Sequence, residues 1–426
     1  MFAFVILIVL ILAGLIIAQI FLAGGFIAGL RGAPAAPLSD GACPKVALII
    51  CIRGRDPTLA DCLNAALTQD YPDYAVHIII DSKTDPAWPL VEKLIGANSE
   101  TPSTMQSLTN PLSSCSLKCS SLIQVISELN ASYEVVALLD TDVIPHRRWL
   151  REMIAPFADA HVGATTGNRW FAPSPPLWAN LYRYAWNAAA VVVMYWLGIA
   201  WGGSMAIKRA VINEGHVLSD WSRTYGEDTA VNPALRRLGL RLEFVSSALI
   251  TERGSCDVPR FLNWVTRQLL SCRLHHEGWK LILFHGMATC VALGLAVLLF
   301  LAGLVLGYTD IVVLTGTALA AFFLVLFFLL ISLELSTRGV SRRNRAAGSL
   351  LQPTTIAKLM LAVVLTQALY AYVLFKAATA RTVEWRRARY DILEGGRIRL
   401  VEYRPFTGSP APIITKPFDK AAPRSW

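Results

Sequence analysis

The chain has 426 residues, of which 54% are hydrophobic and only 16% are charged. Soluble domains average roughly 25% charged residues, so this composition excludes an ordinary soluble protein and predicts a surface covered by lipid. The formal net charge is +9. Arginines flank apolar segments, as at Arg338, Arg342, Arg343 and Arg345, which favours a membrane surface and argues against nucleic acid as a partner.

The cysteines indicate no metal site. None of the eight forms a CxxC pair, and no histidine lies at zinc-finger spacing. Cys115 and Cys119 are the closest pair, and their spacing matches no common site. We therefore expect free thiols, as in proteins of a reducing cytoplasm.

The first apolar run, Phe2 to Leu30, contains no charged residue. A transmembrane helix needs about 20 such residues, whereas a signal peptide has a basic start and a shorter apolar core. We therefore predict that residues 1–31 are a retained anchor, followed by a linker at 32–44. Cleavage within the small-residue stretch 33–36 stays an alternative.

The next part of the chain alternates between strand and helix patterns. β-Branched and apolar runs predict strands at 46–52, 76–80 and 135–139, and residues 58–69 predict a helix that ends before Pro72. Strands joined by helical crossovers predict an α/β domain with a mostly parallel sheet, which we place at residues 45–259.

Two segments of this domain have less definite patterns. Residues 99–121 are rich in Ser and Thr and are expected to form a loop. Residues 185–201 are apolar but short, which favours a buried or membrane-surface segment over a full span.

The C-terminal part contains three further apolar runs, at 281–307, 311–332 and about 357–378. We predict transmembrane helices over residues 281–378, followed by a basic tail at 379–426. If the arginine-rich segments face the cytoplasm, the N-terminus lies outside. Three spans would then place the basic tail outside as well, so either one run is re-entrant or the tail breaks the charge rule.

Residues 260–280 form a basic amphipathic segment. Phe261 and Val265 lie on its apolar side, and Trp264 is typical of a membrane interface. We predict an interfacial helix whose apolar face lies in the headgroup region and admits a lipid from the bilayer.

Asp140-Thr-Asp142 follows the predicted strand at 135–139, and Asp81 follows the strand at 76–80. Ligands of such sheets bind beyond the carboxyl ends of the strands. The pair Asp140 and Asp142 can hold Mg²⁺ or Mn²⁺, which completes its shell with phosphate oxygens. Asp81 could accept hydrogen bonds from a base or ribose. The alternative in each case is a solvated turn.

Glu227 and Asp228 are expected to open a helix that ends at Gly239. Acidic residues at a helix N-terminus are often plain dipole partners. A carboxylate held near a sugar can also act as the general base for an acceptor hydroxyl.

Taken together, these motifs resemble glycosyltransferases of families 2 and 21, which have the GT-A fold, and most closely ceramide glucosyltransferases and their bacterial relatives. The likeness covers about residues 44–280 and the flanking spans. It rests on Val46–Arg53, Leu63–Pro72, Asp81, Asp140–Asp142, Gly202–Met205, Gly226–Asp228 and Arg260–Trp264.

The resemblance implies a Rossmann-like catalytic domain, with Asp140 and Asp142 at the metal and Asp228 as the base, Glu227 being the other candidate. It implies nucleotide-sugar contacts from Arg53, Asp81, Lys118, Asp140, Gly203, Arg260 and Trp264. Two departures affect donor binding. Asn263 stands where the family has Arg, and Ser121 stands where the family has Asn after Lys118.

The implied reaction is an inverting, metal-dependent transfer of a hexose, glucose being the first expectation, from a UDP-sugar to a membrane lipid hydroxyl. This would make the chain a multi-pass cell-membrane protein of glycolipid biosynthesis with a cytoplasmic catalytic domain. A processive polysaccharide synthase and a polyprenyl-phosphate glycosyltransferase remain alternatives. A transporter or scaffold is the non-enzyme alternative, although transporters place charges inside their spans and the runs here are nearly uncharged.

Overall fold

A computed structural model describes residues 2–172, 175–252, 254–341 and 353–406. The chain packs into two units, and each is described by itself. The α/β unit comprises residues 38–164, 202–241 and the C-terminal part from 380. The helical unit comprises the N-terminal residues to 37, residues 165–201 and residues 242–379.

A seven-stranded sheet has the order β3-β2-β1-β4-β6-β5-β7. Its strands are β1 (Val46–Ile52), β2 (Tyr74–Ile80), β3 (Ser103–Ser107), β4 (Val135–Leu139), β5 (Val162–Phe171), β6 (Ser204–Lys208) and β7 (Arg241–Glu252). β1 pairs in parallel with β2 and with β4, and β2 pairs in parallel with β3. β6 runs antiparallel to β4. The predicted class, a mostly parallel α/β sheet with apolar helices at both ends, is confirmed.

Short helices and turns connect these strands. The helices of the α/β unit are α2 (Leu59–Ala66), α3 (Trp88–Ala97), α4 (Leu117–Glu128), α5 (Trp149–Ile154), α7 (Arg209–Glu214), α8 (Val217–Trp221) and α9 (Val231–Arg237), with 3-10 turns at Asp40–Ala42 and Ala155–Ala158. The expectation of a loop over 99–121 is wrong in part, because the segment contains β3 and the start of α4. β3 pairs with the buried strand β2, and this tertiary contact outweighs its polar composition.

The predicted basic tail contains a second, three-stranded antiparallel sheet. It consists of β8 (Thr382–Trp385), β9 (Ala388–Ile392) and β10 (Ile398–Tyr403), with a 3-10 turn at Glu394–Gly396 between the last two strands. Arg386 and Arg387 make the two-residue turn from β8 to β9, with φ of 45° and 65°. Both angles lie in the left-handed region, which costs energy for residues with a Cβ and so requires compensating contacts.

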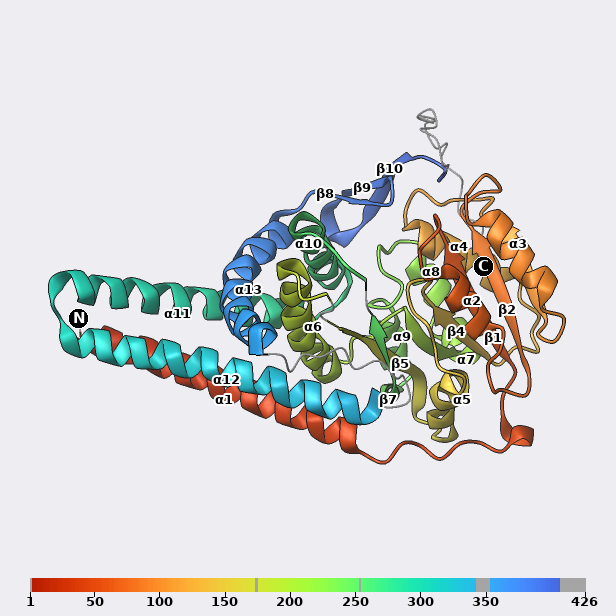
Figure 1. Cartoon of the computed structure of the whole chain (residues 1–426). Helices are drawn as coiled ribbons and strands as arrows, with labels where there is room; N and C mark the ends of the chain where they lie inside the picture. Colours follow the sequence, from red (N-terminus) through yellow and green to blue (C-terminus); the bar gives the residue numbers. More distant parts are fainter. Residues whose placement is uncertain (1, 173–174, 253, 342–352, 407–426) are drawn as a thin grey trace. The chain divides into compact units, whose positions relative to one another are not determined.

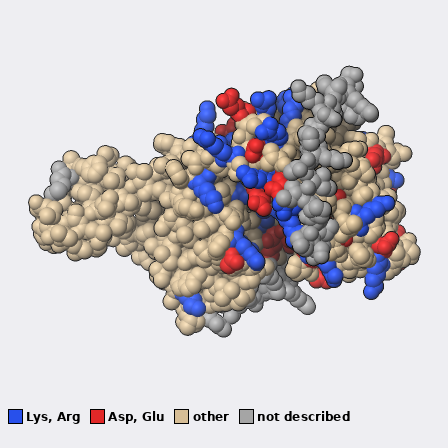
Figure 2. Space-filling view, turned by 90° about the horizontal axis from the view of Figure 1, so that it is seen from above, with Lys and Arg blue, Asp and Glu red and all other residues tan. Residues whose placement is uncertain are grey.

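The helical unit contains α1 (Phe2–Arg31), α6 (Trp178–Leu197), α10 (Val258–His275), α11 (Trp279–Leu306), α12 (Thr309–Ser341) and α13 (Pro353–Thr379). Four of them, α1, α11, α12 and α13, are long and apolar enough to cross a membrane, as predicted, and the chain is a membrane protein. α1 packs along α11 and α12 (Figure 1), and the end of this bundle at the left of Figure 2 is bare of charged side chains.

α13 packs against α10 and α6 as well as against α11. The apolar side of α10 takes part in this packing, because Phe261 and Val265 are 1% and 0% exposed within the cluster that these helices form. The expectation that this side of the helix contacts lipid is therefore wrong for these two residues. The basic residues Arg342, Arg343 and Arg345 and the end of the predicted tail lie outside the described residues.

Candidate functional site

One lysine joins two carboxylates at the carboxyl end of β4. The Nζ of Lys118 lies 2.6 Å from Oδ1 of Asp140 and 2.6 Å from Oε1 of Glu227. Glu227 is 5% exposed, whereas Lys118 and Asp140 are partly exposed. Residues far apart in sequence thus form one compact charged cluster.

Local structure explains this convergence. Asp140 is the first residue after β4, and Lys118 lies in the first turn of α4, whose N-cap Ser116 accepts a hydrogen bond from the amide of Cys119. The amide of Asp140 donates to the carbonyl of Gly203 at 3.3 Å, which fixes the start of β6 beside the end of β4. The sheet thereby holds the backbone on both sides of the cluster.

Gly202 allows Glu227 to enter this cluster. A Cβ at Gly202 would overlap the Glu227 carboxylate and lie 3.2 Å from Nζ of Lys118. A side chain at this position would therefore have to displace the buried carboxylate, and glycine is required for its close approach.

Asp228 lies next to this cluster in a half-buried position. Its Oδ1 accepts from the amide of Thr229 at 2.7 Å, and its Oδ2 accepts from the amide of Gly202 at 3.3 Å. α9 begins only at Val231, so Glu227 and Asp228 belong to the preceding turn. The expectation that they open the helix is wrong, because their side chains bind groups of the cluster and of the adjacent turn.

The electrostatic environment distinguishes Glu227 from an ordinary surface acid. Burial raises its pKa to about 7, with Asp228 and Asp140 raising it further and Lys118 lowering it. Burial lowers the pKa of Lys118, but Asp140 and Glu227 outweigh it and hold that pKa well above its ordinary value. Lys118 is thus a permanent cation, while Glu227 ionises near neutral pH.

Two carboxylates remain at this end of β4 for a divalent cation. Among the described residues there is no group of three or more His, Cys, Asp or Glu side chains that could hold a metal by itself. Asp142 is exposed, and one oxygen of Asp140 already accepts from Lys118. Mg²⁺ is commonly held by one or two carboxylates together with substrate phosphates, so this donor set fits an ion that binds together with a diphosphate.

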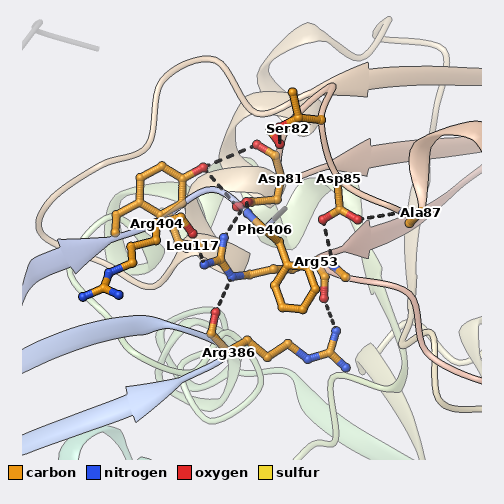
Figure 3. A network of polar contacts seen from close by, with 12 residues as sticks. Arg53, Asp81, Ser82, Asp85, Ala87, Leu117, Arg386, Arg404 and Phe406 are labelled. Atoms are coloured by element: carbon orange, nitrogen blue, oxygen red, sulfur yellow. Dashed lines mark hydrogen bonds and ion pairs between the residues drawn. The ribbon is translucent and has the colours of Figure 1, made fainter. Parts of the chain in front are cut away.

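Arg53 and Asp81 form a second polar centre, at the carboxyl ends of β1 and β2 (Figure 3). Nη1 of Arg53 lies 2.5 Å from Oδ2 of Asp81, and the two side chains are 5% and 2% exposed. Nearby, the carboxylate of Asp85 accepts from the amides of Gly54 and Ala87 at 2.8 and 2.9 Å. Because β1 and β2 are parallel neighbours, their carboxyl ends lie side by side, and the buried ion pair forms where both strands end.

The C-terminal sheet contributes partners to this ion pair that sequence reasoning missed. Arg53 donates to the carbonyls of Arg386 and Arg404, and Asp81 accepts from the Tyr403 hydroxyl and the Phe406 amide. The alternation of apolar and polar residues in Ile398–Tyr403 is a strand signal that could have predicted β10. It could not have indicated which residues β10 contacts.

The remaining two predicted site residues belong to the helical unit. Arg260 is exposed and lies 3.5 Å from a carboxylate oxygen of Asp257 in the first turn of α10. Trp264 packs edge to face against Phe171 and Trp186, with ring centroids 5.3 and 5.2 Å apart. These contacts account for their local structure and do not assign them to the donor.

Asn263, which stands where the resembling families have Arg, has a hydrogen-bond partner in the structure. Its side-chain oxygen accepts from Nζ of Lys376 at 3.1 Å, which joins α10 to α13 within the helical unit. All eight cysteines lie within the described residues, and none of them forms a disulfide there.

The sequence matches glycosyl transferase family 21 over residues 6–398. It shares a segment of 70 residues at 37% identity with a ceramide glucosyltransferase of Gibberella zeae, covering 15% of this chain and 13% of the relative. A ceramide glucosyltransferase of Pyricularia oryzae is 41% identical over 54 residues, covering 12% of this chain and 11% of the relative. The aligned segments thus span only a small part of either relative.

Two solved structures resemble this chain more distantly, with TM-scores below 0.5. The mannosyltransferase PcManGT from Pyrobaculum calidifontis, in complex with GDP-Man and Mn²⁺, has 16% identity and a TM-score of 0.47, over 87% of this chain and 99% of that chain. Glucosyl-3-phosphoglycerate synthase from Mycobacterium tuberculosis, in complex with Mn²⁺ and UDP-glucose, has 11% identity and a TM-score of 0.35, over 60% of this chain and 85% of that chain.

Proposed function

Because the chain belongs to glycosyltransferase family 21, it is a glycosyltransferase, and we propose that it moves a hexose, glucose first of all, from a UDP-sugar to the hydroxyl of a membrane lipid. The observation that carries the proposal is the cluster of Asp140 and Glu227 around Lys118, with Asp228 beside it on the amide of Gly202. It combines carboxylates that can take a proton from a hydroxyl with a cation that can attract a diphosphate.

The pair Arg53 and Asp81 supports uracil as the base of the donor. Uracil presents an N–H flanked by carbonyl groups, and this edge is complementary to a carboxylate acceptor beside a guanidinium donor. Adenine and cytosine present an unprotonated ring nitrogen at the corresponding place and would leave Asp81 facing another acceptor. The same pair also suits the N–H and carbonyl of guanine, so a GDP-sugar is the control donor.

The membrane helices support a lipid as the acceptor. Four helices of the chain are apolar and long enough to span a bilayer, and the short segments of shared sequence belong to ceramide glucosyltransferases. A lipid that reacts at the membrane surface keeps its chains in the bilayer, which avoids a cost of about 0.8 kcal/mol for each exposed CH₂ group.

Asp228 is the proposed general base. Its two oxygens are oriented by the amides of Gly202 and Thr229, whereas Glu227 is buried and bound to Lys118. Asp228 takes the proton of the acceptor hydroxyl, whose oxygen forms the new bond to the anomeric carbon. The bond from that carbon to the diphosphate breaks, and its electron pair leaves with UDP.

Asp140 and Asp142 would hold a Mg²⁺ or Mn²⁺ ion that binds together with the diphosphate leaving group. A divalent ion bound there would neutralise the negative charge of the departing diphosphate. Lys118 keeps one oxygen of Asp140 in a fixed orientation and adds a second positive charge at the same end of the sheet. These residues thereby prepare an anion-binding environment before the donor arrives.

The test is an assay of the purified full chain in lipid nanodiscs with UDP-glucose, UDP-galactose and GDP-mannose, and with total lipid extract as acceptor. We expect a product whose mass equals one lipid plus one hexose minus one water, because the hydroxyl proton is lost and only the hexosyl group is transferred. Asp228→Asn should retain UDP binding and lose transfer by about 10²–10⁴-fold, because the amide cannot accept the proton. Asp73→Asn, which changes an exposed carboxylate elsewhere in the α/β unit, is the matched control.

The result also separates the alternatives. A ladder of long glycan products would indicate a processive synthase, and a product labile to mild acid would indicate a polyprenyl-phosphate acceptor. Consumption of none of the nucleotide sugars would refute the proposed donor class.

A further inference from the structure

The chain's own C-terminal segment occupies the hydrogen-bonding groups of Arg53 and Asp81. Oδ2 of Asp81 accepts from the amide of Phe406 at 3.1 Å, and Oδ1 accepts from the hydroxyl of Tyr403 at 3.2 Å. Nη2 of Arg53 donates to the carbonyl of Arg404 at 2.7 Å. Both oxygens of the carboxylate and one face of the guanidinium are therefore already used.

The arrangement of these contacts resembles that of a bound base. The carbonyl of Arg404 accepts from the Arg53 guanidinium, and the N–H of Phe406 donates to the Asp81 carboxylate. The edge of uracil likewise presents a carbonyl acceptor beside an N–H donor. Figure 3 shows Arg404 and Phe406 beside Arg53 and Asp81, with these hydrogen bonds drawn as dashed lines. A base and this segment cannot use the same donor and acceptor atoms at once.

Aromatic rings close the segment over the ion pair. The guanidinium of Arg53 lies 5.2 Å from the ring centroid of Tyr403 and 5.9 Å from that of Phe406. The Phe406 ring also lies against Gly54, where φ is +77° and an added Cβ would come within 2.7 Å of the ring. Such rings shield the ion pair from water and strengthen the hydrogen bonds beneath them.

The sheet that carries the segment has separate attachments to the α/β unit. The amide of Leu400 donates to the carbonyl of Ser113 at 2.7 Å, and the buried Tyr390 hydroxyl accepts from the amide of Leu117 at 3.1 Å. β10 ends at Tyr403, so Arg404 to Phe406 can leave without breaking any strand pairing. The sheet can stay docked while its end moves.

An ion pair and a hydrogen bond of Arg386 hold the turn between β8 and β9 in place. Arg386 has a left-handed φ, and its guanidinium binds the Asp56 carboxylate at 2.6 Å and donates to the carbonyl of Arg53. These contacts offset the backbone strain of the turn and anchor the sheet beside the ion pair.

We propose that residues Arg404–Phe406, together with the side chain of Tyr403, form a latch that holds Arg53 and Asp81 in the donor-free enzyme and is displaced by the base of the donor nucleotide. The proposal rests on the proposed function, because it takes this pair to be the base-recognition site. The latch keeps the buried charges satisfied between turnovers and makes nucleotide binding depend on the C-terminal segment.

The first experiment removes one hydrogen bond of the latch and measures the Kd for UDP by isothermal titration calorimetry on the full chain. Phe406→Pro deletes the backbone N–H that donates to Asp81. Phe406→Leu keeps that N–H and an apolar side chain. Because the lost bond is made to a charged group, UDP should bind about tenfold more tightly to Phe406→Pro than to Phe406→Leu.

A second variant and a control guard against misfolding as an explanation. Tyr403→Phe removes only the hydroxyl that donates to Asp81 and should also tighten UDP binding. Arg399→Gln alters an exposed residue of the same strand and should leave the Kd unchanged. Equal Kd values for wild type, Phe406→Pro and Tyr403→Phe would overturn the latch.

Hydrogen–deuterium exchange provides an independent readout. Adding UDP to the wild type should increase exchange of the amide at Phe406, while the amide of Leu400, which anchors the sheet, stays protected. Increased protection at Phe406 would mean that the segment completes the site, and the latch would be wrong. If UDP binds neither the wild type nor Phe406→Pro, the donor assignment fails as well; if it binds both equally, only the latch fails.

Discussion

Asp140 and Glu227 share a single ammonium group, because Nζ of Lys118 lies 2.6 Å from an oxygen of each. Glu227 is nearly inaccessible to solvent. We therefore expect Lys118 to influence the stability of this end of the sheet, the ionisation of Glu227 and the charge available to a substrate.

Replacing Lys118 should destabilise the protein. Lys118→Met leaves a buried carboxylate without its cation, and breaking a buried pair by removing one partner costs about 3–5 kcal/mol. Thermal unfolding in nanodiscs should show a clearly lower Tm, and adding Glu227→Gln to Lys118→Met should recover part of the loss. Lys45→Met, at an exposed pair, is the control. A Lys118→Met protein as stable as the wild type would contradict this account of the cluster.

The pH dependence of transfer should reflect Glu227. Its pKa is raised from 4.5 to about 7, mainly by burial, so the carboxylate forms only as the pH rises through about 7. If the ionised group is needed to hold Lys118, kcat/KM should rise with pH over this range. Glu227→Gln cannot ionise and should lack this limb. An unchanged limb in Glu227→Gln would assign it to another group.

The raised pKa of Glu227 also predicts how its contribution to the stability of the fold changes with pH. Because the folded-state pKa lies above the ordinary value, the folded protein holds this proton more tightly than the unfolded chain does. The contribution of Glu227 to stability is therefore greatest below pH 4.5 and declines as the pH rises to about 7. Comparing the Tm of wild type and Glu227→Gln across this range measures it.

Gly202 should not tolerate a side chain. Gly202→Ala places a methyl group where the Glu227 carboxylate lies, so we expect both a lower Tm and a loss of transfer. Gly96→Ala is a suitable control, because an added Cβ there meets no atom within 4 Å and the residue lies in α3. Alanine favours a helix over glycine by roughly 0.5–1 kcal/mol, so this variant should be neutral or slightly more stable. Equal effects of the two substitutions would refute the steric argument.

Removal of divalent metal should stop transfer without unfolding the protein. Asp140 and Asp142 suit an ion that binds with the diphosphate, so EDTA should abolish product formation, and Mg²⁺ or Mn²⁺ should restore it. Asp142→Ala should behave like the chelated enzyme with an unchanged Tm, because Asp142 is exposed. Full activity of Asp142→Ala would remove it from the metal site.

The C-terminal sheet leads to a prediction about the membrane topology. Residues 241 and 380 belong to the same α/β unit, so we expect the chain between them to cross the membrane an even number of times. Three helices in this stretch, α11, α12 and α13, are long and apolar enough to cross. α11 and α12 are joined at Tyr308 and pack together, whereas α13 contains Lys358 and Lys376 and packs on α10 and α6. We therefore expect α13 to begin and end on the side of the α/β unit.

Cysteine labelling tests this expectation. In a cysteine-free background, Thr354→Cys and Thr382→Cys at the two ends of α13 should react with an impermeant reagent from the same side, and Tyr308→Cys should react from the other. Labelling of residues 354 and 382 from opposite sides would show that α13 spans the membrane. The expected result would also place the arginines of β8–β10 on the α/β side and resolve the conflict with the charge rule.

The sequence by itself determined the features that depend on local chain properties. Long uncharged runs can only be covered by lipid or protein, so α1, α11 and α12 were predictable from composition alone. The β-branched run of β1 and the aspartates at the ends of β2 and β4 were predictable because strand periodicity and strand ends are local signals. These features sufficed to place Asp81 and Asp140 at one edge of the sheet.

Only the tertiary structure decided which side chains meet. Lys118 was expected to contact the donor, and its position between Asp140 and Glu227 depends on how α4, β4 and the turn before α9 pack together. The attachment of Phe406 and Tyr403 to Asp81 joins residues more than three hundred positions apart, for which no periodic pattern exists. Buried charges must find partners wherever the fold brings them, and that requirement is a property of the packed chain and not of any one segment of its sequence.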